Sequence, residues 1–488
     1  MVIESLKYKI LQQFGFAPTQ EQGQALDTFV SFLTDRDPQA VMILRGSAGT
    51  GKTSLSGAIV RTLLQIRQKV MLLAPTGRAA KVFSLGSGAP AYTIHRRIYR
   101  EKVFAGVDGQ FSLNDNLYTD TLFMVDEASM IANMGLGGTT FGSGCLLDDL
   151  VKFVYQGHND RLLLIGDKAQ LPPVGEEESP ALSASVMEGY GLKVYECDLN
   201  EVLRQSQSSG ILYNATLIRQ MITHDAVTGL PLIRFKGFAD IVMMPGAELV
   251  ESLGDSYHHV GMDETMVITR SNKRANIYNN GIRNMVLDRE EELSSGDMLM
   301  IVKNNYFWTE KEKKESGEGS AGAVPAFLAN GDRAKVLRVS NYIELYGFRF
   351  ATLLLQLPDY DDYEMQVTGM LDTLQSEAPA LTHEQQEELF RQVEEDYQHF
   401  VPLKADRMKS IRQDAYFNAL QIKYAYAVTC HKAQGGQWAH VYVDQGYMTD
   451  DMLTPDYIHW LYTAFTRATD KLFLVNWPKE QTCEPTDL

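Results

Sequence analysis

The chain of 488 residues alternates between short runs of consecutive apolar residues and longer segments with apolar residues at helical spacing. A short apolar run bounded by glycine or polar residues is typical of a strand that is buried on both faces. Because helical segments follow most of these runs, the pattern predicts an α/β fold with parallel sheets. The strands expected from it are 41–44, 70–74, 122–125, 161–165, 265–269, 441–443 and 472–475.

The pattern changes between 296 and 355, where short strands with alternating apolar residues replace the apolar runs. These strands predict a small β-barrel inserted in the second α/β unit. Segment 376–397 carries seven acidic residues against one basic residue at helical spacing, which is typical of a solvated helix. We therefore expect a first domain at 1–215, a second domain at 216–295 and 416–488, and a barrel with an acidic helical accessory segment at 296–415.

Two further segments stand out within the first domain. Two short strands, 103–107 and 110–113, flank Asp108-Gly109, a dipeptide that favours a type I′ turn. They predict a β-hairpin at about 100–118. The glycine-rich segment 133–145 is typical of a loop, and the sequence assigns no role to it.

A phosphate-binding loop is predicted at 46–53, between the strand 41–44 and a helix expected over 54–66. Its glycines allow backbone N–H groups to turn toward a polyphosphate, and the helix N-terminus adds its positive dipole end. Lys52 would reach the β- and γ-phosphates, and the Thr53 hydroxyl would hold Mg²⁺. The nucleotide-binding residues predicted here are Gly46, Ser47, Ala48, Gly49, Thr50, Gly51, Lys52, Thr53 and Ser54.

Three polar side chains near strand ends are candidates for chemistry at this loop. Asp126 and Glu127 follow the strand 122–125, where two adjacent acids would be costly inside a core. Asp126 can hold Mg²⁺ through water, and Glu127 can activate the attacking water. Gln170, after the strand 161–165, is a neutral amide that could sense a γ-phosphate.

Gln22 has two interpretations that the sequence leaves open. Thr19 and Gln22 have the spacing of a capping box at a helix N-terminus. Alternatively, the Gln22 amide reads the adenine edge beside the phosphate-binding loop.

Polar and basic loops predict a second binding surface. The strand 70–74 ends in a Pro-Thr-Gly-Arg turn that leads into a helix N-terminus, where a ligand phosphate can bind. Segment 93–102 concentrates four Arg or Lys residues and one His in an otherwise acidic chain, which favours phosphate contacts. The loop after the strand 265–269 is similarly basic and polar. The candidate nucleic-acid contacts from these loops are Pro75, Thr76, Gly77, Arg78, His95, Arg96, Arg270 and Asn272.

Composition narrows the class of protein. The net charge of −17 argues against a wholly basic nucleic-acid coat but leaves room for a channel with a local basic stripe. The four cysteines are scattered without metal-ligand spacing, which predicts a reducing compartment and a cytoplasmic protein. No run approaches the ~20 apolar residues of a membrane helix, so no membrane partner is expected.

In their order along the chain, these stretches resemble the motifs of superfamily 1 helicases. The resemblance is to the branch that includes RecD-like and Dda-like enzymes, which move 5′ to 3′ on single-stranded DNA. It implies two RecA-like domains with ATP in the cleft between them, Mg²⁺ as cofactor, single-stranded DNA and duplex junctions as partners, and a monomer. The stretches that carry it are 46–53, 74–80, 126–129, 166–174, 203–205, 426–435 and 462–468.

The resemblance also implies roles for single residues. Gln22 would contact adenine, and Gln170 would couple the γ-phosphate to the nucleic acid. Arg204 and Arg467, the latter on a helix expected at 460–469, would be arginine fingers. The hairpin lies where the family has its strand-separating pin, and the barrel matches an accessory domain. Residues in motifs that touch the strand are Thr76, His95, Thr429, His431 and Lys432.

Three rival hypotheses remain. The first is a translocase that moves on single strands with little unwinding, and the second is an RNA helicase of the same superfamily. The third is a P-loop scaffold that binds nucleotide without turnover. A scaffold needs none of Glu127, Gln170, Arg204 and Arg467, so their presence argues against it.

Overall fold

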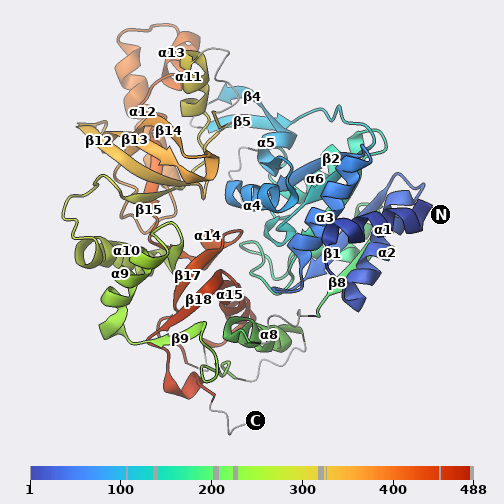
Figure 1. Cartoon of the computed structure of the whole chain (residues 1–488). Coiled ribbons are helices and arrows are strands. Elements are labelled where there is room, and N and C mark those ends of the chain that lie inside the picture. Colours follow the sequence, from blue (N-terminus) through green and yellow to red (C-terminus); the bar gives the residue numbers. More distant parts are fainter. Residues whose placement is uncertain are drawn as a thin grey trace.

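The computed structural model describes residues 2–483 apart from 106–107, 136–140, 202–207, 224–228, 317–323, 326 and 450–451. Within these ranges the chain forms two parallel sheets, a closed barrel and a two-stranded hairpin (Figure 1). The α/β architecture expected from the sequence is confirmed, including the inserted barrel. None of the described helices is long and apolar enough to cross a bilayer.

The first unit is built on a six-stranded parallel sheet with the order β3-β2-β6-β7-β1-β8. Alternate residues of β1 enter different cores, with Met42 and Leu44 on one face of the sheet and Val41 and Ile43 on the other. This period of two explains why the strand is apolar throughout. Its strands are β1 (Ala40–Gly46), β2 (Lys69–Ala74), β3 (Ala91–Thr93), β6 (Thr121–Val125), β7 (Arg161–Gly166) and β8 (Lys193–Leu199). Its helices are α1 (Val2–Phe14), α2 (Gln20–Thr34), α3 (Lys52–Gln65), α4 (Gly77–Ser87), α5 (Ile94–Ile98), α6 (Leu146–Gln156) and α7 (Ala184–Gly189).

The second unit has a five-stranded parallel sheet with the order β16-β10-β17-β18-β9. Its strands are β9 (Ile241–Met244), β10 (Thr265–Thr269), β16 (Ala427–Thr429), β17 (Trp438–Asp444) and β18 (Ala468–Val475). Its helices are α8 (Gly210–Thr223), α9 (Leu249–His259), α10 (Asn272–Gly281), α14 (Cys430–Ala433) and α15 (Pro455–Phe465).

The domain boundary expected at residue 215 is wrong. Residue 215 lies inside α8, and Ile211, Ala215 and Ile218 of this helix are buried in the core of the second unit. Since one apolar helix face cannot be divided between two cores, the second unit takes up all of α8.

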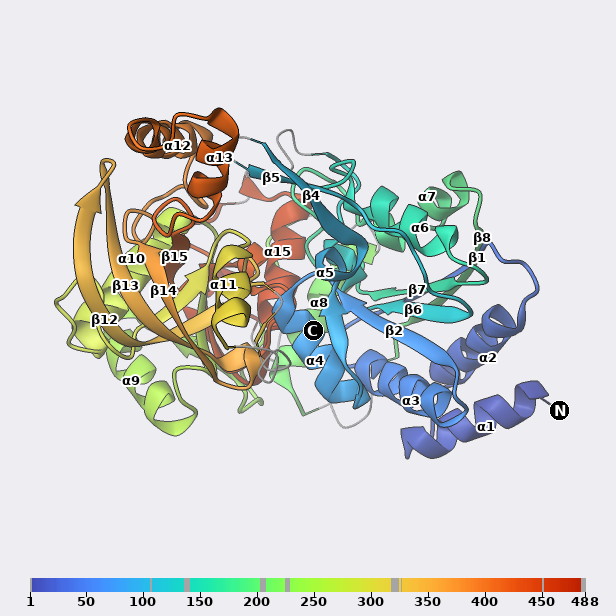
Figure 2. The same ribbon diagram turned by 90° about the horizontal axis from the view of Figure 1, so that it is seen from above.

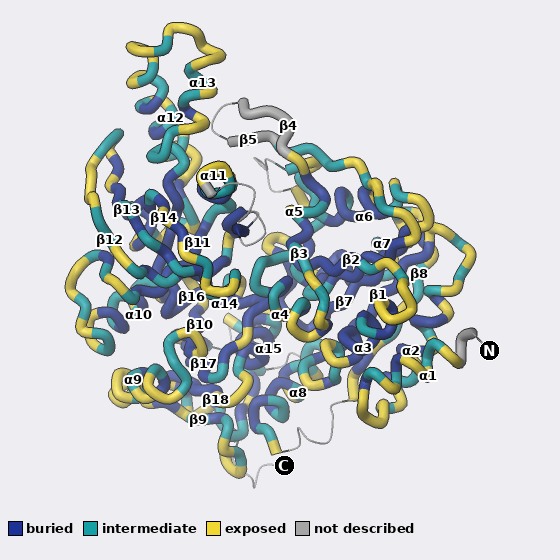
Figure 3. The backbone as a smooth tube through the Cα atoms, turned by 45° about the horizontal axis from the view of Figure 1, so that its top comes forward, coloured by how far each residue is buried: buried dark blue, intermediate teal, exposed yellow. Residues whose placement is uncertain are grey.

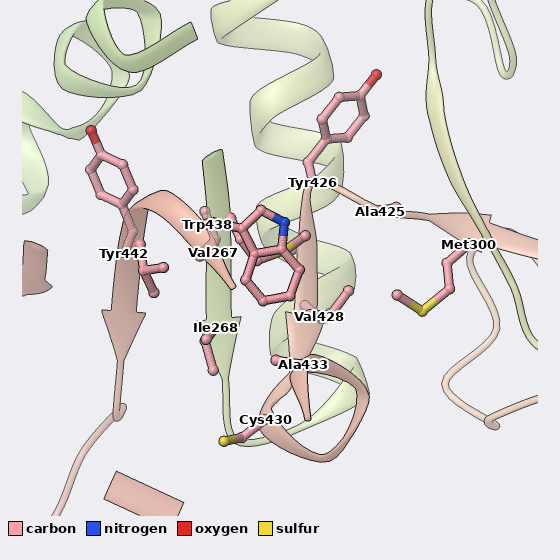
Figure 4. Packing of buried hydrophobic residues seen from close by; sticks show 14 of the residues in the cluster. Val267, Ile268, Met300, Ala425, Tyr426, Val428, Cys430, Ala433, Trp438 and Tyr442 are labelled. Carbon is pink, nitrogen blue, oxygen red and sulfur yellow. The ribbon is translucent and has the colours of Figure 1, made fainter. Parts of the chain in front are cut away.

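The barrel contains β11 (Met298–Ile301), β12 (Arg333–Leu345), β13 (Phe348–Leu357), β14 (Tyr363–Met370) and β15 (Leu420–Tyr424). The boundary expected at residue 415 is wrong, because β15 closes the barrel by pairing with both β11 and β14. Buried residues run without a break from the second sheet into the barrel, for example from Val267 through Tyr426 to Met300 (Figure 4).

A two-residue link, 425–426, joins the last barrel strand β15 to β16 of the second sheet. Asn279 of α10 holds this link. Its amide nitrogen donates to the Ala427 carbonyl at 3.0 Å, and its amide oxygen accepts from the backbone N–H groups of Tyr426 at 3.1 Å and Ala427 at 2.8 Å. Asn279 is itself buried. The barrel and the second sheet are therefore joined through a short and fully bonded connection.

Helices α11 (Phe307–Ser316), α12 (His383–Gln398) and α13 (Lys404–Arg412) accompany the barrel. The acidic segment is helical as expected, although the helix begins at His383 and not at 376. Most of α12 and α13 is exposed or half-buried (Figure 3). Leu389 and Val393 are the apolar anchors that α12 buries against the barrel.

The predicted hairpin is present, as β4 (Tyr99–Ala105) and β5 (Asp108–Leu113). The turn expected at Asp108-Gly109 is wrong, because these residues belong to β5 and pair with Ala105 and Phe104. The connection between the strands falls on 106–107, outside the described residues. The hairpin lies between the six-stranded sheet and the barrel (Figures 1 and 2).

Candidate nucleotide and nucleic-acid site

The phosphate-binding loop connects the end of β1 to the start of α3, as the sequence predicts. Gly49 and Gly51 both have a φ of 78°, which glycine adopts without strain. A Cβ on Gly46 would lie 2.7 Å from Cγ of Lys52 and 2.9 Å from Oγ1 of Thr50. The loop therefore has no room for a side chain at this position. The Lys52 ammonium donates to the carbonyl of Gly46 inside this loop.

Gln22 joins the helix cap to the phosphate-binding loop. Thr19 and Gln22 form both hydrogen bonds of the predicted capping box. The Gln22 amide nitrogen also donates to the Thr50 carbonyl at 2.9 Å, and the side chain is buried. The capping interpretation is confirmed. The adenine contact stays a prediction, and the amide lies next to the loop where that contact would be made.

Asp126 and Glu127 lie at the carboxyl end of β6. Burial, together with the neighbouring Glu127, raises the pKa of Asp126 to about 7, while Lys52 acts in the opposite direction. A partly buried carboxyl next to a lysine is stabilised in its charged form when a cation binds. The Thr53 hydroxyl and the Asp126 carboxylate are hard oxygen donors of the type that Mg²⁺ prefers. These residues therefore fit the predicted metal.

The loop 166–174 contacts the second unit through hydrogen bonds from α15. The Tyr462 hydroxyl donates to Asp167 at 2.7 Å and accepts from the backbone N–H of Ala48 at 2.9 Å. The backbone N–H of Leu171 donates to the Thr463 hydroxyl at 2.8 Å. Tyr462 thus ties the phosphate-binding loop, the loop after β7 and the second unit together.

Gln170 is buried beside this network. Its amide oxygen has no hydrogen-bond partner among the described residues. A buried acceptor without a partner costs free energy until a donor reaches it. Gln170 therefore keeps an acceptor available at the junction of the two units, as a coupling residue requires.

Of the two predicted arginine fingers, the structure describes only one. Arg204 lies outside the described residues. Arg467 was expected on a helix, and this is wrong because α15 ends at Phe465. The buried Arg467 guanidinium donates to the carbonyls of Thr463 at 3.1 Å and Gly436 at 3.2 Å, within its own unit. Its contact with phosphate stays a prediction.

Arg219 is a residue at this site that sequence reasoning missed. It projects from α8 of the second unit, and its guanidinium donates to the Ser47 hydroxyl and, at 3.5 Å, to the Asn200 carbonyl. It matches none of the helicase motifs. The available signal is that Arg219 is the only charged residue of α8, which is otherwise apolar and polar.

The predicted strand contacts after β2 gather where three parts of the chain meet. Thr76 caps α4 by accepting from the N–H of Ala79 at 3.2 Å. The Arg78 guanidinium lies 4.5 Å from the Trp438 ring of the second unit. A Cβ on Gly77 would lie 2.4 Å from a carboxylate oxygen of Asp332 in the barrel. The start of α4 is therefore covered from both sides in this conformation.

Asp332 is a charged group at this junction that sequence reasoning also missed. Its side chain is buried, and Tyr360 and the backbone N–H of Ala329 donate to one carboxylate oxygen at 2.6 and 2.7 Å. The other oxygen has no hydrogen-bond partner among the described residues. Burial, with a smaller contribution from Asp359, raises the pKa of Asp332 to about 7.

The second group of strand contacts lies on the short helix α14. Thr429 precedes the helix, His431 is exposed, and Lys432 is half-buried. The Lys432 ammonium has no hydrogen-bond partner among the described residues, and burial lowers its pKa to about 8, with help from Lys423. A half-buried side chain whose ammonium is shielded from water and has no partner is suited to an anionic ligand.

The remaining strand candidates lie apart. His95 packs against Tyr99 and Phe141, and burial lowers its pKa to about 4. The Arg96 guanidinium lies 5.1 Å from the Tyr92 ring. Arg270 contacts the Met448 sulfur, while Asn272 is the first residue of α10. The structure therefore gathers Thr76–Arg78 with the second unit and the barrel, and leaves the other contacts untested.

Comparison with known proteins gives two family matches. Residues 17–229 match the AAA domain family, and residues 424–475 match the UvrD-like helicase C-terminal domain family. The first match covers the phosphate-binding loop through α8, and the second covers β16 through β18.

Uncharacterized protein R530 of Acanthamoeba polyphaga mimivirus is 22% identical over 508 residues, which cover 90% of this chain and 96% of that protein. Two curated helicases match over a smaller part of their length. The ATP-dependent RecD2 DNA helicase of Deinococcus radiodurans is 30% identical over 158 residues, which cover 32% of this chain and 18% of that protein. The ATP-dependent DNA helicase dda of Enterobacteria phage T4 is 26% identical over 267 residues, which cover 53% of this chain and 55% of that protein. The match therefore spans about half or less of either relative. Among solved structures, Pif1 helicase from Bacteroides in complex with ADP-AlF3 and ssDNA aligns over 96% of this chain and 95% of that chain, with 13% identity and a TM-score of 0.47.

Proposed function

We propose that this chain is a superfamily 1 helicase of the RecD-like and Dda-like branch, an ATP-dependent enzyme that moves 5′ to 3′ on single-stranded DNA and separates duplexes. The two family matches and the two helicase relatives support this proposal. The observation that supports this most directly is the Tyr462 hydroxyl, which bonds the phosphate-binding loop and Asp167 from the second unit. A side chain shared in this way makes the contact between the units sensitive to what the loop binds.

ATP hydrolysis is assigned to the residues around the loop. Lys52 leaves the Gly46 carbonyl and turns to the β- and γ-phosphates, and Glu127 accepts a proton from the attacking water. Thr53 and Asp126 would hold Mg²⁺, which neutralises phosphate charge when it is bound. Arg204 and Arg467 stabilise charge on the transferring phosphoryl group once the units close.

The protein moves along the DNA strand because its two units bind the strand in turn. The start of α4 and the residues around α14 belong to different units, and both carry polar groups near a helix N-terminus. The start of α4 would reach a DNA strand once Trp438 and Asp332 move away from it. Contacts of this kind go to the phosphate backbone and are independent of sequence. The hairpin β4–β5 would split the duplex ahead. We propose that the protein acts in DNA repair and recombination, because both processes need exposed single strands. We also propose that it is a cytoplasmic monomer.

The decisive test measures ATP hydrolysis with and without single-stranded DNA, and then unwinding of duplexes with a 5′ or a 3′ tail. We expect DNA to stimulate hydrolysis, and only the 5′-tailed duplex to be unwound. Unwinding from the 3′ tail would keep the motor and overturn its polarity. Stimulation without unwinding would indicate a translocase, and stimulation by RNA alone would indicate an RNA helicase.

A further inference from the structure

The glycine-rich segment 133–145, which the motifs leave without a role, returns to the hairpin at Phe141. Phe141 forms an isolated parallel bridge with Phe111 of β5, and the backbone N–H of Gly142 donates to the Phe111 carbonyl at 2.8 Å. The two rings stack with centroids 4.6 Å apart and an interplanar angle of 18°. Backbone and side chain of this segment therefore both contact one residue of the hairpin.

The same segment is anchored to the body of the first unit. The Phe141 ring lies 5.3 Å from Tyr99 and 5.1 Å from His95. Asp149 of α6 accepts from the Tyr99 hydroxyl at 2.7 Å and from the backbone N–H of Ser143 at 2.9 Å. Asp149 is only 3% exposed, so these bonds are shielded from water.

Only glycine fits at position 142. Its φ is +48°, in the left-handed region that favours glycine. An added Cβ would lie 2.0 Å from a carboxylate oxygen of Asp149 and 2.6 Å from Cε1 of Tyr99. A side chain here would displace the segment from α6, from the hairpin, or from both.

The hairpin needs such support. Strands β4 and β5 form a sheet of two strands, separate from the six-stranded sheet. An isolated hairpin of two strands is marginally stable in water. Phe111 also lies 4.9 Å from Tyr306, which stacks on Phe327, so the Phe111 ring contacts the inserted segment as well as the first unit. Phe141 supplies the contact on the side of the first unit.

We propose that Phe141 and Gly142 are positioning residues that hold the hairpin against the first unit so that it separates strands under load. The proposal rests on the proposed function, and it assigns these two residues to strand separation and not to ATP hydrolysis. Neither residue needs to contact DNA. The property that depends on them is the fraction of steps along the strand that open a base pair.

The experiment compares Phe141→Ala, Phe141→Tyr and Gly142→Ala in the full chain. Each variant is measured for DNA-stimulated ATP hydrolysis, for translocation on single-stranded DNA and for unwinding of a 5′-tailed duplex. We expect Phe141→Ala and Gly142→Ala to lose about tenfold in unwinding rate, while hydrolysis and translocation stay within about twofold of the parent. Phe141→Tyr keeps the stacked ring and should retain most of the unwinding.

Matched controls use the same substitutions elsewhere. Phe400→Ala removes a ring that is 80% exposed, and Gly254→Ala adds a Cβ that meets nothing within 4 Å. Both should unwind as the parent does. Equal loss of hydrolysis and unwinding in Phe141→Ala would overturn the proposal, as would unchanged unwinding. Weaker binding of single-stranded DNA in proportion to the loss of unwinding would make Phe141 a base-stacking residue instead.

Hydrogen exchange separates a failure of this inference from a failure of the proposed function. Backbone amides of β4 and β5 should exchange faster in Phe141→Ala and Gly142→Ala than in the parent or the controls, whether or not the protein unwinds DNA. A parent protein that does not unwind would contradict the proposed function alone. If the amides of β4 and β5 exchange at the same rate in these variants as in the parent, then Phe141 and Gly142 do not hold the hairpin.

Discussion

The nucleotide side and the strand side of this protein are built in different ways. On the nucleotide side, one strand, one turn and one helix bring Gly46 through Thr53 together, and Lys52 is held by the loop's own carbonyls. On the strand side, the start of α4 is completed by a ring from the second sheet and a carboxylate from the barrel. Local sequence therefore determines the first surface, whereas the second depends on how three units are packed.

The largest effect is expected on the nucleotide side. Lys52→Ala should lower ATP turnover by at least about 10²-fold, because it removes the cation that faces the transferring phosphate. Binding of single-stranded DNA without nucleotide should be unchanged, which turnover and fluorescence-anisotropy measurements would show together. Lys69→Ala, an exposed lysine at the start of β2, is the control. Full turnover in Lys52→Ala would remove this loop from the mechanism.

A smaller effect is expected where the two units touch. Arg219→Ala should raise KM for ATP about tenfold with a lesser change in kcat, since a hydrogen bond from a charged group contributes roughly 1.5–3 kcal/mol. Initial-rate kinetics measure both constants. Leu217→Ala on the same helix removes a partly exposed side chain and serves as the control. A fall in kcat at constant KM would show that Arg219 acts after nucleotide binding.

The strand side should respond to pH through Asp332. Its pKa rises from 3.8 in the unfolded chain to about 7 in the folded one, so the folded state holds the proton more tightly between these values. Rising pH therefore lowers the stability of the parent by at most about 1.4 kcal/mol per pH unit in this window. Asp332→Asn lacks this dependence, and its melting temperature relative to the parent should increase from about pH 5 to pH 7 and then level off. A constant difference would show that Asp332 does not titrate in this window.

The smallest effect is expected at the helix cap. Thr19→Ala removes half of the capping box and should lower the free energy of unfolding by about 1 kcal/mol. KM for ATP should also rise slightly, because Gln22 loses the partner that orients its amide toward Thr50. Thermal melting measures the change in stability, and initial-rate kinetics measure KM for ATP. Melting unchanged from the parent would mean that the cap contributes nothing measurable.

The sequence predicts those features that depend on neighbouring residues. The phosphate-binding loop, the capping box and the acids after β6 lie where they were expected, because strand ends, glycines and caps act within a few residues. The inserted barrel was also predictable from its alternating pattern.

Several of the errors share a physical cause, which is contact between segments that are distant in the sequence. Strand β15 falls in the range 416–488 that was expected to belong to the second domain, yet its partners β11 and β14 place it in the barrel. Asp108-Gly109 has the chemistry of a turn, yet the register of β4 carries it into β5. Asp332 has no local signal, and Arg219 is marked only as the single charged residue of α8, since Ser47 and Gly77 meet these residues only after the units are packed.

The short link at 425–426 has a mechanical meaning. Asn279 bonds the backbone N–H of Tyr426 and both backbone groups of Ala427, so the short connection between the barrel and the sheet that carries Thr429 and α14 is held to α10. We expect a force on the barrel to reach the strand that ends at Thr429 directly, because no flexible tether lies between them. The barrel should then move with the second unit as one body.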